Sequence, residues 1–257
     1  DIIIHAMNNT VDAASAFTVT TPDAKGFAVQ DTSVTLTITP ASSIAYKLED
    51  TMNVAALTIS ANASLTTLDG SSNRGLNVSG DCIVNGTLTG NASAIEMGSL
   101  TISGTYSATT HANGTIITDR AGAGYQLSCA VADIIHNDGK FDFRGSSGGA
   151  SDIRLNGASD GTNGLHDVII NASGRTVSLN SYALTIDGNL TITAGTFSTS
   201  GSNYGLTVTG NASVTGTLTG NASAISLGSL EIASGGTYNA TSGTTTMTGV
   251  SDGAFNF

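Results

Sequence analysis

The chain has 257 residues, a formal net charge of −11 and only 11% charged residues. This acidic balance disfavours binding to nucleic acid through a basic patch, and no apolar run is long enough for insertion into a membrane. Aromatic residues make up 5% of the chain, tryptophan is absent, and glycine occurs 32 times. Small aliphatic side chains must therefore build the core, and the glycines indicate many turns instead of long helices.

Residues 1–53 are predicted to form a β-rich N-terminal cap or docking region. This segment contains both prolines, Pro22 and Pro40, and the alternating run SVTLTIT at 33–39. It lacks the Asn-Ala-Ser punctuation of the later chain. A stack of coils has to shield its terminal edge, and this is the role that we expect for the segment.

Residues 54–257 are predicted to form a solenoid, because this part of the chain repeats itself. The stretches 75–102 and 205–232 match at 19 of 28 positions without a gap, and the decapeptide GTLTGNASAI is identical in both. Two related blocks, about 54–143 and 181–257, are joined by a Gly/Ser/Asp-rich passage. A long internal repeat of short strands and glycine turns is typical of stacked coils.

Within the blocks, aliphatic residues alternate with Thr or Asn, which is the period of a strand with one buried face. Strands this short bury that face only if the chain coils back onto itself. The pattern predicts an all-β fold, a right-handed parallel β-helix (β-solenoid). We expect the aliphatic residues to point inward and to occupy the same places in both copies: Leu76, Val78, Val84, Leu88, Ile95, Leu100 and Ile102, then Leu206, Val208, Val214, Leu218, Ile225, Leu230 and Ile232.

The first block carries 18 more residues than the second, roughly 113–130. The flanking motifs still match, because 104–106 corresponds to 236–238 and 138–143 corresponds to 252–257. We interpret the extra residues as one additional coil, which the chain could gain or lose as a unit.

The stretch LHDVIINASGRTVSLNSYALTIDGNLTITAGTF (165–197), followed by GLTVTGNASVTGTLTG (205–220), resembles known solenoid repeats. Similar Gly/Thr/Asn-rich repeats occur in very large bacterial surface adhesins and in fibre-like virion proteins of tailed phages. The resemblance covers about residues 54–257. It implies an extended, surface-exposed and non-catalytic part.

A dense polar cluster between residues 133 and 167 is the best candidate for chemistry. Its members are Asp133, His136, Asp138, Asp142, Arg144, Asp152, Arg154, Asp160, His166 and Asp167. Solenoid polysaccharide lyases and tailspike hydrolases place carboxylates on one face, sometimes with calcium. A solvated loop needs the same residue types, and the cluster holds no glutamate. We therefore favour a surface loop over an ion site or a catalytic site.

Other metal patterns are weak. Gly148-Gly149-Ala-Ser-Asp152 is similar to a calcium-binding nonapeptide, but its aspartate is one place early and the motif does not repeat. The four histidines, His5, His111, His136 and His166, show no ligand spacing. We assign no catalytic, cofactor-binding or metal residues and expect no cofactor.

Covalent modification is also open from the sequence. Cys82 and Cys129 are too few for a disulfide framework; separate buried thiols are favoured over a pair. Asn-x-Ser/Thr sequons are frequent, at Asn62, Asn91, Asn113, Asn171, Asn189, Asn211, Asn221 and Asn239. Asparagine suits left-handed turn positions, so composition explains these sequons better than glycosylation does.

Thr-x-Thr pairs raise the possibility of a flat array of hydroxyls, as in ice-binding solenoids. The pairs are Thr87/Thr89, Thr191/Thr193, Thr207/Thr209 and Thr217/Thr219. An ice-binding face needs one regular pair in each coil. The separations here are irregular, which favours ordinary strand propensity as the explanation.

Together, these patterns predict a non-catalytic structural or adhesive fibre segment, either a phage virion fibre or decoration protein or a bacterial adhesin repeat. The alternatives are a tailspike-like polysaccharide depolymerase and an ice-binding solenoid. Expected partners are copies of the chain in a homo-oligomer, other structural proteins of a fibre or particle, and surface glycans. The expected location is extracellular or on the virion surface; the virion is preferred because no secretion signal is visible at the start.

Overall fold

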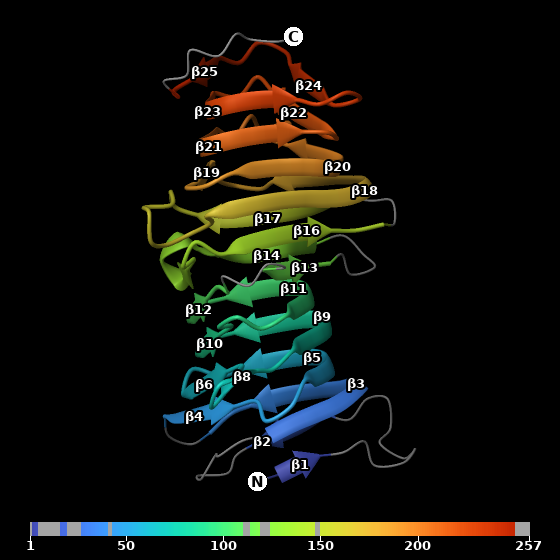
Figure 1. Ribbon diagram of the computed structural model, residues 1–257, viewed down its shortest axis with the longest axis vertical. Helices are drawn as coiled ribbons and strands as arrows, with labels where there is room; N and C mark the ends of the chain where they lie inside the picture. The colour runs from blue at the N-terminus through green and yellow to red at the C-terminus, as the bar shows by residue number, and fades with distance from the viewer. Residues whose placement is uncertain are drawn as a thin grey trace.

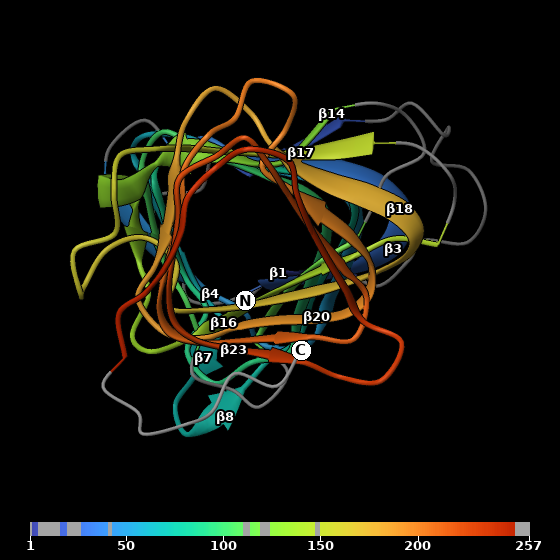
Figure 2. The same ribbon diagram turned by 90° about the horizontal axis from the view of Figure 1, so that it is seen from above.

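A computed structural model describes residues 2–4, 16–19, 27–40, 43–109, 114–118, 124–146 and 150–249. These residues form a parallel β-solenoid, which confirms the predicted all-β stack of coils. The turns pile up along a rod (Figure 1). A view down the rod shows that each turn follows three sides (Figure 2).

Strand pairing defines the three faces of the rod. Face 1 contains the paired positions Asn53, Asn77, Glu96, Ile116, Asp142, Ile169, Thr191, Ser213 and Glu231. Face 2 contains Leu36, Leu57, Cys82, Leu100, Leu127 and Ile153, and later Val177, Phe197, Leu218 and Tyr238. Face 3 contains Tyr46, Leu65, Leu88, Tyr106 and Ile134, and later Ile186, Val208, Leu227 and Met247.

Long strands bend around a corner and serve two faces. From face 1 to face 2 run β3 (Phe27–Ile38), β5 (Met52–Ile59), β9 (Leu76–Val84), β11 (Ile95–Ile102), β18 (Asp167–Leu179) and β20 (Leu190–Ser198). From face 3 to face 1 run β21 (Leu206–Val214) and β23 (Ile225–Ile232). Shifts of register, as between Met97 and Ser99 in β11, mark the bends.

The remaining strands serve one face each. Face 1 has β1 (Ile2–Ile4), β13 (Thr115–Ile117) and β16 (Lys140–Arg144), and face 2 has β2 (Ala16–Val19), β14 (Gly124–Ala130), β17 (Ala150–Asn156), β22 (Thr217–Asn221) and β24 (Thr237–Ala240). Face 3 has β4 (Ile44–Lys47), β6 (Ala63–Thr66), β10 (Thr87–Thr89), β12 (Thr105–Ser107), β15 (Ile134–Ile135), β19 (Leu184–Ile186) and β25 (Thr245–Met247). An antiparallel pair, β7 (Leu68–Asp69) and β8 (Ser72–Asn73), projects from the stack, and η1 (Val131–Asp133) is a single 3-10 turn. No helix in the described ranges has the length and hydropathy of a membrane span.

Alternating side chains fill the interior of the rod. In β9, Leu76 and Val78 are buried and Asn77 between them is half-buried. All seven inward positions expected in the first block are buried, and five of the seven in the second. Leu230 and Ile232 are only partly buried, because they lie near the end of the described stack, where fewer turns cover them.

The parallel stack runs through residue 53, where the sequence suggested a boundary with an N-terminal cap. β3 pairs with β5, and β4 pairs with β6, so residues 27–47 form a turn of the same kind as those that follow. Leu36, Ile38 and Tyr46 belong to the common core. The described part of segment 1–53 therefore continues the solenoid.

The two sequence copies do not occupy the same places, contrary to expectation. In the first copy Leu76 lies on face 1 and Leu88 on face 3. Their counterparts, Leu206 and Leu218, lie on face 3 and face 2. The second copy is thus rotated by one face about the rod axis. The offset of 130 residues does not equal a whole number of turns.

The extra residues of the first block are not a whole coil either. Within the span 113–130, β13 supplies a strand to face 1 and β14 supplies one to face 2, while face 3 of the same turn is formed by β15 at Ile134–Ile135. The span therefore provides two of the three sides of a turn. The copy in 252–257 used to define this span lies outside the described residues.

The identical decapeptide builds the same corner in both places. Asn91 and Asn221 adopt the left-handed region, with φ of 50° and 49°, which asparagine tolerates well. Their side-chain amides donate to the hydroxyls of Thr67 and Thr199 in the preceding turn, at 3.3 and 3.4 Å. Each of these threonines donates to the carbonyl just before the asparagine, at 2.6 and 2.8 Å. The repeat therefore encodes a corner and not a particular face.

Candidate functional site

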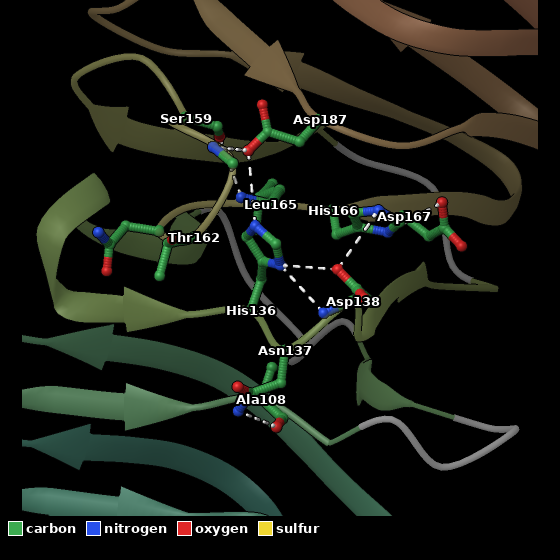
Figure 3. Close-up of polar contacts among 12 residues, drawn as sticks. Ala108, His136, Asn137, Asp138, Ser159, Thr162, Leu165, His166, Asp167 and Asp187 are labelled. Atoms are coloured by element: carbon green, nitrogen blue, oxygen red, sulfur yellow. Dashed lines mark hydrogen bonds and ion pairs between the residues drawn. The ribbon is translucent and has the colours of Figure 1, made fainter.

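Five ionisable side chains meet where face 3 turns into face 1 (Figure 3). They come from three successive turns: His136 and Asp138 follow β15, His166 and Asp167 stand at the start of β18, and Asp187 follows β19. The two imidazole rings lie 5.2 Å apart between centroids, tilted by 37°. We call these five residues the histidine corner.

The tight turn after β15 fixes the first histidine. Asn137 and Asp138 have φ of 46° and 53°, a conformation that Asn and Asp accept more readily than most residues. The backbone N–H of Asp138 donates to Nδ1 of His136 at 3.0 Å. The neutral imidazole therefore carries its proton on Nε2, which faces Oδ2 of Asp187 at 3.5 Å. The side chain of His136 is only 3% exposed.

The second histidine is more open. Nε2 of His166 lies 3.7 Å from Oδ1 of Asp138, and its Nδ1 lies 3.4 Å from Oδ1 of Asp167. The side chains of His166 and Asp138 are 27% and 80% exposed. Gly188 of the next turn makes this arrangement possible, because a Cβ there would lie 2.4 Å from Oδ1 of Asp167 and 2.7 Å from Nδ1 of His166.

Two carboxylates of the histidine corner bind backbone amides of other turns or loops. Oδ1 of Asp167 accepts the N–H of Asn189 at 2.8 Å, and Oδ2 of Asp187 accepts the N–H of Gly161 at 2.8 Å. A carboxylate pair that cleaves a glycosidic bond has to face that bond from both sides. Here both carboxylates hold the protein's own backbone. These hydrogen bonds and ion contacts link three successive turns of the rod.

The tie continues along the rod as a ladder of corner residues. Oδ1 of Asn189 accepts the N–H of Asn211 at 2.9 Å, and Oδ1 of Asn211 accepts the hydroxyl of Ser229 at 2.7 Å. The equivalent pair in the first copy, Asp81 and Ser99, makes the same side-chain contact at a different corner. The ladder explains why Asp or Asn recurs beside these glycines.

The other members of the predicted polar cluster do not join the histidine corner. Asp142 pairs with Arg144 on face 1 at 2.8 Å, and Asp152 accepts the amide of Asn180 on face 2 at 2.9 Å. The remaining members have separate partners: Asp133 with the N–H of Ala130, Arg154 with the ring of Tyr125, and Asp160 with the N–H groups of Thr162 and Asn163. The bond from Asn163 holds the pKa of Asp160 below its usual value. The cluster is therefore spread over several faces.

Sequence reasoning missed one member of the histidine corner, Asp187. It lies 51 residues beyond His136, so proximity in the chain gives no hint of it. A local signal exists: Asp187-Gly188 repeats the Asp138-Gly139 pattern of a corner. Across the described ranges, no group of three or more His, Cys, Asp or Glu side chains is arranged to hold a metal ion. His5, His111 and the pair Gly148-Gly149 lie outside those ranges.

Both cysteines are free and buried, as the sequence favoured. Burial raises the pKa of the Cys82 thiol to about 12, with a smaller contribution from the neighbouring Asp81 charge. Burial also raises the pKa of Cys129. Burial and a raised pKa both disfavour the thiolate, which is the reactive form of cysteine.

The sequons at Asn91 and Asn221 have structural roles at the corners, since their side-chain amides already donate hydrogen bonds there. Those at Asn189 and Asn211 belong to the corner ladder. Asn113 lies outside the described residues.

A second ion group lies beside the projecting hairpin. Nζ of Lys47 lies 2.6 Å from Asp69, and Arg74 lies 3.2 Å from the same carboxylate. The hydrogen bond from Lys47, followed by that from Arg74, lowers the pKa of Asp69; the same bond raises the pKa of Lys47. A shallow hollow of about 290 Å³ lies elsewhere, on face 1, and Glu96 is its sole charged lining residue.

Comparison with protein family models, with curated proteins and with solved structures finds no match to this chain.

Proposed function

We propose that this chain is a non-catalytic segment of a structural or adhesive fibre, at a virion surface or outside a cell. The observation that carries the proposal is the continuous parallel ladder along faces 1 and 2, from β3 to β24, wrapped around one aliphatic core. With strands spaced by about 4.8 Å, a stack of this kind gives a stiff rod on the order of 50 Å long. Rods of this kind act as spacers and carriers of exposed surfaces.

The ionisable groups support a structural role over a depolymerase. Asp167 and Asp187 each accept a backbone N–H with one oxygen, and Asp142 and Asp152 have partners on different faces. Such contacts hold turns in register. Partners consistent with the proposal are other copies of the chain, other structural proteins of a fibre or particle, and surface glycans.

Two measurements on the purified chain test the proposal. Small-angle scattering with light scattering should report an elongated particle and its number of copies. Incubation with capsular and cell-wall polysaccharides should release no reducing sugar. Release by the parent chain that is abolished by Asp138→Asn, but retained by Asp152→Asn, would favour the depolymerase and refute the proposal.

A further inference from the structure

Face 2 carries a regular array of polar side chains, seven of them hydroxyls, over its last four described turns. The first column is Thr176, Thr196, Thr217 and Thr237; the second is Ser178, Ser198, Thr219 and Asn239, in which Ser198 is buried and Asn239 carries an amide instead of a hydroxyl. We call these eight residues the hydroxyl array. Between the columns, Val177, Phe197, Leu218 and Tyr238 point into the rod.

The register of the array is regular although its spacing in the sequence is not. Thr176, Thr196 and Thr217 are direct partners, yet they stand 20 and 21 residues apart. The corners absorb the difference in length, and no register shift falls inside the array. Irregular spacing was the reason to set aside a hydroxyl face in the sequence, and the pairing removes that reason. Three of the four rungs escape a search for Thr-x-Thr, because serine or asparagine takes the second column; only Thr217-x-Thr219 is found by it.

The first column consists of threonine alone, and its hydroxyls are available. Within the described part of the chain, the side chains of Thr176, Thr196, Thr217 and Thr237 form no hydrogen bond. In the second column, the buried hydroxyl of Ser198 accepts the N–H of Ser200 at 3.1 Å and the side-chain amide of Asn221 at 3.4 Å. Each available threonine offers one donor and two acceptor lone pairs beside a methyl group.

The backbone fixes the dimensions of the array. Neighbouring rungs are separated by the strand spacing, about 4.8 Å, and the columns by two residues along a strand, about 6.6 Å. These repeats lie close to oxygen repeats on the prism faces of hexagonal ice. Because both repeats are set by the ladder and not by flexible loops, water bound to the array is held in a lattice with little further ordering cost.

We propose that the hydroxyl array is a binding surface for ordered water, and hence for the prism face of ice. Its outward side chains are uncharged and none is aromatic, whereas sugar rings are commonly bound by stacking on aromatic rings. The array ends toward the N-terminus at the charged pair of residues Asp152 and Arg154, where Asp152 is the partner of Ser178. The surface is thus a bounded patch on one face.

A similar patch on face 3 serves as an internal comparison. There Ser64, Thr87 and Thr105 form one column, but in the other column Thr66 accepts the amide of Asn91 at 2.8 Å, and Ser107 accepts that of Asn137 at 2.7 Å. Two of the three hydroxyls in that column, which also contains Thr89, therefore accept a corner amide, against one of three in the second column of the hydroxyl array, that of Ser198. We expect this patch to contribute less than the hydroxyl array.

The test is an ice-recrystallisation assay on the full chain and two matched double variants. Thr196→Lys with Thr217→Lys places long charged side chains in the centre of the hydroxyl array. Thr87→Lys with Thr105→Lys makes the same change on face 3. Circular dichroism and thermal melting establish that both variants keep the fold, since all four residues point outward.

The parent should stop the growth of ice grains, the array variant should need at least about tenfold more protein for the same effect, and the face 3 variant should behave like the parent. Unrestrained grain growth with the parent would overturn the proposal, as would equal loss in both variants. If the parent leaves ice unaffected, two further measurements would assign the hydroxyl array to another ligand and so overturn the proposal. Array-dependent retention on insoluble cellulose or chitin would assign it to glycans, and array-dependent self-association in sedimentation velocity would assign it to a second copy of the chain.

Discussion

Leu88 and Leu218 allow one sequence to be tested in two surroundings. Both side chains are fully buried, and both stand in the decapeptide GTLTGNASAI. Leu88 is stacked between Leu65 and Tyr106, which are also fully buried. Leu218 is stacked between Phe197 and Tyr238, and Tyr238 is only partly buried.

Truncation of each leucine to alanine should destabilise the fold by different amounts. Leu→Ala changes in cores cost about 2.7–5.0 kcal/mol, and the cost falls where neighbours can close the cavity. Rigid neighbours on both sides place Leu88→Ala near about 4 kcal/mol. The less confined Tyr238 can settle toward the gap, which places Leu218→Ala near about 3 kcal/mol. The local sequence cannot account for this difference in cost, because the same decapeptide surrounds both leucines.

Equilibrium urea unfolding followed by far-ultraviolet circular dichroism measures both values. The slope of the free energy with urea should stay that of the parent, since a change would indicate loss of cooperativity. Thr217→Ser, on the outer face beside Leu218, is the control and should cost less than about 0.5 kcal/mol. If Leu218→Ala costs as much as Leu88→Ala or more, confinement by neighbouring turns does not set the cost and the reasoning fails.

The remaining predictions concern register, thiols and acid stability. Deletion of Thr89–Tyr106 removes one full turn, because Leu88 is stacked on Tyr106, and it should leave a folded, shorter rod by circular dichroism. Deletion of 113–130 should not, because it removes only two sides of a turn. The opposite result would contradict the three-face assignment. Cys82 and Cys129 should resist a thiol reagent until urea unfolds the chain, and fast labelling of the native protein would show that they are not buried. The lowered pKa of Asp69 means that its contribution is present above its ordinary pKa and is lost as pH falls through the folded value, so Asp69→Asn should lessen the decline in stability as pH falls below about 4; an unchanged decline would show that the Asp69 ion pairs do not stabilise the fold.

The strands and the core could be predicted from the sequence, because burial on one face of a short strand leaves a period of two. Leu76, Val78 and Leu88 were predicted to point inward and do. The sequence also predicted left-handed turns at asparagine, and Asn91 and Asn221 adopt this conformation. These features depend on residues close together in the chain.

The assignment of strands to faces could not be predicted, because it depends on the length of every corner between them. The passage 157–164 forms an irregular loop, and loops of this kind change the number of residues in a turn without changing its three sides. The lengths of the intervening corners decide that Asp187 lies beside His136 and that Thr196 pairs with Thr217. The pairing register of a strand depends on the summed lengths of all the corners before it, so a local sequence pattern cannot predict that register.

The offset of the two copies by one side has a consequence for how such rods change over time. A duplicated block that lands a fractional number of turns away keeps its corner and its buried residues, but it presents its outer residues at a new azimuth. The core accepts the same block in two placements, with its leucine on face 3 in the first copy and on face 2 in the second. Duplication and shortening of a single block can therefore move a given outer surface from one face of the rod to another, while the interior stays filled by the same buried residues.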